Sequence, residues 1–220
     1  MNFDELTNNR VTLSGQIVTA PVFSHEVYGE GFYEFKLSVL RLSDTADVIP
    51  ITISERLIQA NLLTVGSRIS VSGSFRSYNK ITENHSKLML TVFARSIDDY
   101  DPELNPNVIE LDGFLCKKPM YRTTPFKREI CDMLLAVNRA YNKSDYIPCI
   151  AWGRNARFVN TLAVGERILL SGRVQSRDYV KTLEDGTEQL RTAYEVSVSH
   201  LSTPSSSAEP PIASCAFGVR

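Results

Sequence analysis

The order of glycines and prolines in this chain repeats after about 98 residues. Gly15 is matched by Gly113, and Pro21 by Pro119. Each of these residues marks a backbone geometry rather than a packing preference, so a shared order at a constant spacing does not arise readily by chance. The other matches are Leu37–Arg41 with Leu135–Arg139, Ile49–Pro50 with Ile147–Pro148 and, after one residue of slippage, Thr64–Ile69 with Ala163–Ile168 and Gly73 with Gly172. We interpret the chain as a tandem duplication of one domain type.

Length and local composition set the expected domain boundaries. A chain of 220 residues can form two domains of about 100 residues, each with its own small core. Pro102 and Pro106 interrupt any continuous strand between 99 and 107, which predicts the linker there. We therefore expect one domain at 1–100 and a second at 101–202. Residues 203–220 are rich in Ser, Pro and Ala, so we expect a flexible tail.

Both copies show five runs rich in β-branched and aromatic residues, with one helical stretch between the third and fourth. In the first copy the strands are expected at Asn9–Val18, Phe32–Leu40, Asp47–Ile53, Ser67–Phe75 and Leu88–Ile97, with the helix at Ser54–Leu63. In the second they are expected at Val108–Leu115, Cys131–Asn138, Tyr146–Trp152, Arg167–Val174 and Thr192–Leu201, with the helix at Asn155–Leu162. This order predicts an all-β fold of two tandem five-stranded OB-fold barrels, each with one short helix between strands 3 and 4. Such barrels bind oligonucleotides or oligosaccharides on one face.

The stretch Tyr146–Phe158 contains the only tryptophan of the chain, at the end of a predicted strand. Alternation along a strand places Tyr146, Pro148, Ile150 and Trp152 on one face and Ile147, Cys149 and Ala151 on the other. Because both faces are largely apolar, this strand is either buried in a core or offers one face to a ligand that stacks on aromatic rings. Arg154 and Arg157 follow directly, which favours single-stranded nucleic acid as that ligand.

The charge is unevenly distributed, although the formal net charge is only −1. Residues 1–100 carry nine Lys and Arg against eleven acids, a net of −2, whereas residues 113–181 carry thirteen against five, a net of +8. Such a local excess can attract phosphates within a Debye length of roughly 8 Å, whatever the total charge is. A solvated surface with no ligand is the alternative interpretation of the charge alone.

Other site classes receive little support from the sequence. Cys116, Cys131, Cys149 and Cys215 have no Cys-x-x-Cys spacing and no nearby histidine pair, so we expect buried thiols and no metal or cofactor. The sequence has no apolar run long enough for a membrane span. The acidic N-terminal segment is unlike a secretory signal, so we expect a cytoplasmic protein.

The second copy closely resembles the bacterial single-stranded DNA-binding protein family over about ninety residues. The resemblance rests on Asn107–Val108, Leu111–Leu115, Pro119, Arg122–Pro125, Leu135–Arg139, Ile147–Gly153, Ala156, Gly165, Gly172–Arg177, Tyr179, Arg191–Thr192 and Tyr194–Val196. The first copy is similar to this family only in its glycine and proline skeleton. The resemblance implies a tandem OB-fold form of a non-catalytic protein that binds single-stranded DNA in replication, recombination or repair. Because family members commonly assemble four barrels, it also implies a homodimer.

The resemblance also implies a set of binding residues. Bases would stack on Tyr141, Tyr146, Trp152 and Tyr179, with Tyr78 as an aromatic counterpart of Tyr179 in the first copy. Phosphates would be contacted by Lys117, Lys118, Arg122, Arg139, Arg154, Arg173 and Arg177. The alternatives are that Trp152 is an ordinary core residue and that Arg122 anchors a loop to a neighbouring subunit.

The first copy lacks most of these rings, because Ser43, Val48 and Ser54 stand where the second copy has Tyr141, Tyr146 and Trp152. We therefore expect domain 1 to bind DNA weakly and to contribute mainly to assembly. A different contact could come from its first hairpin, which contains His25, Tyr28, Phe32 and Tyr33.

Two other functions compete with this interpretation. A nuclease would need clustered carboxylates, and the sequence offers Glu110 with Asp112 and Asp98 with Asp99, whereas His25, His85 and His200 lie far apart. A primosomal or mobile-element scaffold would use its barrels mainly to bind protein. The last residues, Ala213–Arg220, lack the acidic tip with which family members recruit replication and repair proteins, so the protein partners stay open.

Overall fold

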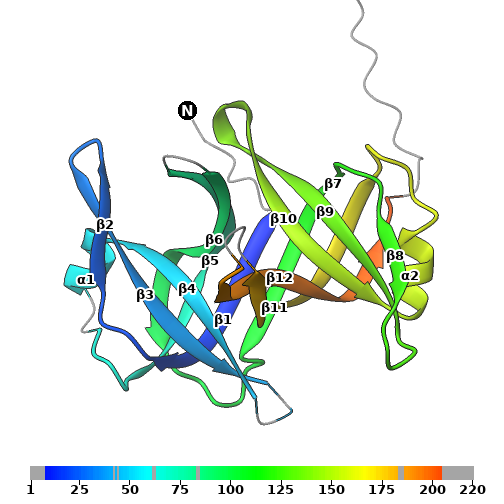
Figure 1. Cartoon of the computed structure of the whole chain (residues 1–220). Helices are drawn as coiled ribbons and strands as arrows, with labels where there is room; N and C mark the ends of the chain where they lie inside the picture. The colour runs from blue at the N-terminus through cyan, green and yellow to red at the C-terminus, as the bar shows by residue number, and fades with distance from the viewer. Residues whose placement is uncertain are drawn as a thin grey trace, which may run out of the picture.

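The structure is a computed structural model that describes residues 8–41, 43, 45–60, 63–82, 85–182 and 186–204. Within these residues, twelve strands form one continuous sheet that curls into two barrels (Figure 1). The first barrel contains β1 (Asn9–Ile17), β2 (Val22–Val27), β3 (Glu30–Leu40), β4 (Ala46–Ser54), α1 (Glu55–Ala60), β5 (Arg68–Thr82) and β6 (His85–Asp99). The second contains β7 (Asn107–Leu115), β8 (Met120–Thr123), β9 (Glu129–Arg139), the 3-10 turn η1 (Ala140–Asn142), β10 (Lys143–Trp152), α2 (Arg154–Val159), β11 (Arg167–Thr182) and β12 (Glu188–Ser202).

The two barrels have the same strand order on either side of the β1–β7 pair. Outward from β1 the order is β5, β6, β4, β3 and β2, and outward from β7 it is β11, β12, β10, β9 and β8. Additional pairings of β3 with β1 and of β9 with β7 close each barrel. β1 and β7 pair antiparallel, from Asn9 opposite Leu111 to Leu13 opposite Asn107, and lie side by side between the barrels (Figure 1). A backbone ladder therefore joins the two barrels directly.

The repeated glycines have a steric cause. Gly73 and Gly172 each lie where the register of the long hairpin shifts, β5–β6 in one barrel and β11–β12 in the other. A Cβ atom at Gly73 would stand 2.1 Å from the Phe93 carbonyl oxygen, and one at Gly172 would stand 2.2 Å from that of Ser197. No other residue fits so close to a backbone, so the repeat records the positions at which each barrel bends.

The fold class predicted from the sequence is confirmed, and all ten predicted strands are present. Each barrel has one further short strand, β2 or β8, which pairs with the edge of β3 or β9. The long hairpin strands extend beyond their predicted ends, to Thr82 in β5 and Thr182 in β11. Both helices are shorter than predicted; residues 61 and 62 of the first prediction, and 205–220 of the predicted tail, lie outside the described residues.

Apolar side chains fill both barrels. The largest fully buried ones include Leu13, Phe75 and Ile147. Cys131 and Cys149 are buried, as predicted, and Cys116 is partly buried, whereas Cys215 lies outside the described residues. Neither helix in the described ranges combines the length and apolarity of a membrane crossing. Among the same residues, no three His, Cys, Asp or Glu side chains gather as a possible metal site.

Candidate nucleic-acid interface

One face of β10 is open, and it carries the rings predicted from the sequence. Ile147, Cys149 and Ala151 point into the barrel and are buried, whereas Tyr146 and Trp152 are exposed. Trp152 is 37% exposed, which excludes the alternative that it is an ordinary core residue. This alternation follows from the two-residue period of a strand whose inward positions are apolar from Ile147 on, although Ile150, on the face of the two rings, is also buried.

Polar contacts position the two rings of β10. The Trp152 indole Nε1 donates a hydrogen bond of 3.2 Å to the Ser197 hydroxyl on β12. The Tyr146 backbone N–H donates to the Ser77 hydroxyl of the first barrel at 2.7 Å. Both rings therefore belong to one strand, β10, which neighbouring elements hold in place, and both side chains are exposed.

The other predicted stacking residues lie on turns and hairpins. Tyr141 is in the η1 turn before β10, has left-handed backbone angles (φ 61°, ψ 36°) and is 83% exposed. Tyr179 is exposed on β11, with the Arg177 guanidinium carbon 6.0 Å from its ring centroid. Tyr78 is exposed on β5. When the two hairpins are aligned at their register shifts, next to Gly73 and Gly172, Tyr78 corresponds to Arg177. Arg177 lies two residues before Tyr179 on the same face of its strand.

Lys117 and Lys118 lie beside the open face of β10. Both are exposed and border a hollow of about 430 Å³ whose floor includes Pro148, which lies between Tyr146 and Trp152 on that face. Leu88 from the β5–β6 hairpin of the first barrel lines the same hollow. Two predicted cations thus border a hollow that includes Pro148, on the strand face that carries the predicted rings.

Three further predicted cations are exposed on the second barrel, two of them in ion pairs. Arg154 is exposed at the start of α2. The Arg122 Nε lies 2.7 Å from Asp132, a carboxylate that raises the pKa of this guanidinium. The Arg177 Nε lies 3.9 Å from Glu195. An exposed pair such as Arg122–Asp132 contributes only about 0–1 kcal/mol, so Arg122 can exchange it for a phosphate at little cost. Glu195 is mostly buried, but its contact with the exposed Arg177 is long.

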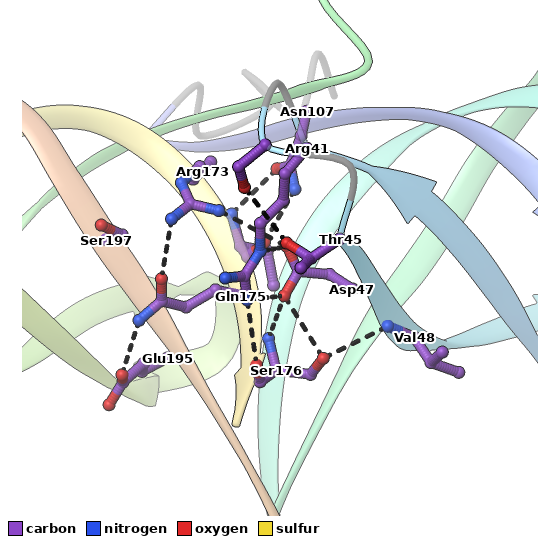
Figure 2. A network of polar contacts seen from close by, with 12 residues as sticks. Arg41, Thr45, Asp47, Val48, Asn107, Arg173, Gln175, Ser176, Glu195 and Ser197 are labelled. Atoms are coloured by element: carbon purple, nitrogen blue, oxygen red, sulfur yellow. Dashed lines mark hydrogen bonds and ion pairs between the residues drawn. The ribbon is translucent and has the colours of Figure 1, made fainter. Parts of the chain in front are cut away.

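Arg173 instead belongs to the junction between the barrels, where Asp47 is fully buried (Figure 2). The Asp47 carboxylate accepts hydrogen bonds from Arg41 Nε at 2.8 Å and from the Ser176 backbone N–H at 2.7 Å. The Arg173 Nη1 lies 3.5 Å from the same carboxylate, and Nη2 donates to Gln175. Burial and the neighbouring Arg41 charge lower the pKa of Arg173.

A matching junction surrounds Asp145, which is also fully buried and lies 98 residues after Asp47. Its carboxylate accepts hydrogen bonds from the Ser77 backbone N–H at 2.8 Å and from Arg76 Nη1 at 2.9 Å. Arg139, another predicted phosphate contact, lies 3.5 Å from it. Neither aspartate was predicted from the sequence, because each is buried partly by contacts from the other barrel, Asp47 by Ser176 and Asp145 by Ser77.

Two of the four carboxylates considered for catalysis, Asp112 and Glu110, pair with arginines. Asp112 accepts two hydrogen bonds from Arg167, at 2.8 and 2.6 Å, and Glu110 accepts one from Arg10 at 2.7 Å.

In the first hairpin, Tyr28 stands exposed at the turn and Tyr33 packs against the core. His25 and Phe32 lie with their rings stacked.

Residues 106–203 match the family model described as "Single-strand binding protein family". This match spans the C-terminal barrel. Single-stranded DNA-binding protein 1 of Staphylococcus aureus (strain COL) is 39% identical over 80 residues, which cover 33% of this chain and 48% of that protein. The single-stranded DNA-binding protein of Clostridium tetani (strain Massachusetts / E88) is 34% identical over 93 residues, 39% of this chain and 63% of that protein. The chain thus spans about half to two thirds of the length of these relatives.

The two-barrel arrangement is shared with a solved single-stranded DNA-binding protein. The wild-type single-stranded DNA binding protein from Thermus aquaticus superposes with a TM-score of 0.73 over 92% of this chain and 95% of that chain. A deletion mutant of the Thermus aquaticus protein gives a TM-score of 0.70, with 93% and 97% covered. At 21% and 22% sequence identity, this likeness shows a common fold.

Proposed function

We propose that the chain binds single-stranded DNA with little dependence on sequence and without catalysis. The observation that carries this proposal is the open face of β10, where Tyr146 and Trp152 are exposed between buried inward neighbours. Tyr141 and Tyr179 add exposed rings on neighbouring parts of the same barrel. A base that stacks on such a ring gains about 1–3 kcal/mol, and all bases have a face to stack.

The cations divide into two groups by their contacts. Lys117, Lys118 and Arg154 are exposed, and we assign them direct contacts with phosphates. Arg122 and Arg177 can join them by leaving weak surface ion pairs. Arg139 and Arg173 face fully buried aspartates, so in our proposal they add positive potential, and Arg173 also pairs across the two barrels with Asp47.

The proposed setting is DNA replication, recombination or repair at the nucleoid, processes that expose single-stranded DNA; the relatives that match the second barrel are named for binding it. A homodimer of two-barrel chains would provide four OB-folds. Residues 213–220 contain no Asp or Glu, so we assign no replication or repair protein to this segment as a partner.

The test is a titration of the full chain with a fluorescein-labelled oligothymidylate of about 35 nucleotides, which exceeds the roughly 4–16 nucleotides that one OB-fold covers. The proposal predicts tight binding that Trp152→Ala weakens and that Trp152→Phe largely retains, because Phe keeps a ring to stack on. Weak binding that is equal in all three proteins would favour barrels that mainly bind protein. Cleavage of the oligonucleotide in the presence of magnesium would contradict the non-catalytic assignment.

A further inference from the structure

The first barrel carries a large aromatic ring at the position where the second barrel has Ser197. In the second barrel β10 pairs in parallel with β12, with Ile150 opposite Ser197, and in the first barrel β4 pairs with β6, with Thr52 opposite Phe93. Ser54 ends β4 as Trp152 ends β10. The large ring therefore lies on different strands in the two barrels. In the second barrel it is Trp152 on β10, with Ser197 on β12; in the first it is Phe93 on β6, with Ser54 on β4.

Phe93 belongs to a row of three rings that crosses three strands. The His25 ring of β2 lies 5.2 Å from the Phe32 ring of β3, with an angle of 16° between their planes. The Phe32 ring lies 5.6 Å from that of Phe93 on β6. Phe32 stands opposite Ser54, whereas its counterpart Ile130 stands opposite Trp152 and is buried. In the second barrel an aliphatic side chain replaces the middle ring of this row.

The two outer rings of this row, His25 and Phe93, border a hollow of about 630 Å³, which is larger than the hollow beside Lys117 and Lys118. His25 and Phe93 line it together with Tyr78. The Tyr78 hydroxyl donates to Glu34, and burial and this carboxylate raise its pKa, so the phenol stays neutral at physiological pH. Three rings, those of His25, Phe93 and Tyr78, therefore line one hollow in which a flat base can stack.

The hollow also reaches the second barrel. Arg76 of the first barrel and Arg139 of the second both line it, and both pair with the buried Asp145. Arg139 directly precedes the η1 turn that carries Tyr141. A single DNA strand that stacks on Tyr141 and continues into the hollow of the first barrel would therefore pass the guanidinium groups of Arg139 and Arg76.

We propose that this hollow is a second base-stacking site, in which His25, Phe93 and Tyr78 bind bases of the same single strand that the second barrel holds. This site rests on the proposed function. It gives the first barrel a direct part in binding, in place of the weak, mainly structural part expected from its missing rings.

A single-tryptophan reporter tests the site in the full chain. Trp152 is the only tryptophan of the chain, so Phe93→Trp combined with Trp152→Phe moves the fluorophore into the first barrel and keeps a ring in the second. We expect an oligothymidylate of about 35 nucleotides to quench the fluorescence at position 93 at saturation. If the unsubstituted chain shows quenching and this variant does not, the second site is overturned and the proposed function stands. If neither is quenched, both fail. Should Phe93→Trp not fold, Tyr78→Trp in the same background reports from the same hollow.

Loss of the rings provides an independent measurement. The double variant His25→Ala/Phe93→Ala should weaken binding of the long oligonucleotide by roughly five- to 150-fold for each base that loses its platform. The matched control is Phe23→Ala, which removes an exposed ring from the same strand as His25; this ring packs edge-on against Tyr33, outside the hollow. Equal affinities of the double variant and this control would overturn the second site.

Discussion

The buried carboxylate of Asp47 should be one of the most costly single side chains to remove from this protein. Asp47→Ala deletes the acceptor of three close hydrogen bonds, two from Arg41 at 2.8 and 2.5 Å and one from the Ser176 backbone N–H at 2.7 Å. Removing one partner of a buried ion pair costs about 3–5 kcal/mol. Arg41 is partly exposed and keeps a bond of 3.2 Å to the Ser176 carbonyl oxygen, which places the expected loss near the lower limit, about 3 kcal/mol.

Urea-induced unfolding, followed by circular dichroism, measures this loss. With a slope of about 2 kcal/mol per molar urea, a loss of about 3 kcal/mol lowers the midpoint by about 1.5 M. Glu110→Ala is the matched control, because Glu110 also pairs across the two barrels, with Arg10 at 2.7 Å, but both side chains are at least half exposed. This control should lose no more than about 1 kcal/mol. Equal midpoints for the two variants would refute the view that buried junction carboxylates hold the barrels together.

Three further predictions follow from the same contacts. Trp152→Ala should weaken binding of single-stranded DNA by about 1–3 kcal/mol in fluorescence anisotropy titrations, and an unchanged affinity would remove this ring from the interface. If Lys117, Lys118 and Arg154 each neutralise one phosphate, their combined replacement by Ala should reduce the slope of log affinity against log salt by about 2, and an unchanged slope would place the phosphates elsewhere. Burial raises the pKa of the Cys149 thiol, so iodoacetamide should alkylate it only after unfolding, as peptide mass spectrometry can show; rapid modification of the native protein would contradict the buried position.

Much of the fold could be predicted because its signals are local. Gly73 and Gly172 mark close backbone approaches that only glycine allows, and β5 alternates apolar and small polar residues from Ile69 to Phe75 around Gly73. β2 was missed because all six of its residues are exposed, so it has no buried face to reveal it. The ends of β5 and β11 were missed for a related reason, since the β11 residues from Arg177 onward are all exposed.

The candidate site was only partly predictable, because some of its features depend on distant contacts. The rings of β10 follow from one strand and its alternation. Asp47, by contrast, reads in the sequence as an ordinary surface acid, and its burial depends on Ser176 in the other barrel. Phe93 escaped notice because β6 is displaced relative to the 98-residue repeat: its counterpart Ser197 lies 104 residues further along the chain.

The most direct test of the central claim is the fluorescence of Trp152 in the unmodified chain during titration with single-stranded and double-stranded oligonucleotides of equal length. Because the indole is exposed on the open face of β10, single strands should quench it in a saturable, salt-sensitive way, and duplex should have little effect at the same concentrations. An unchanged signal with single strands, or equal quenching by duplex, would contradict the account.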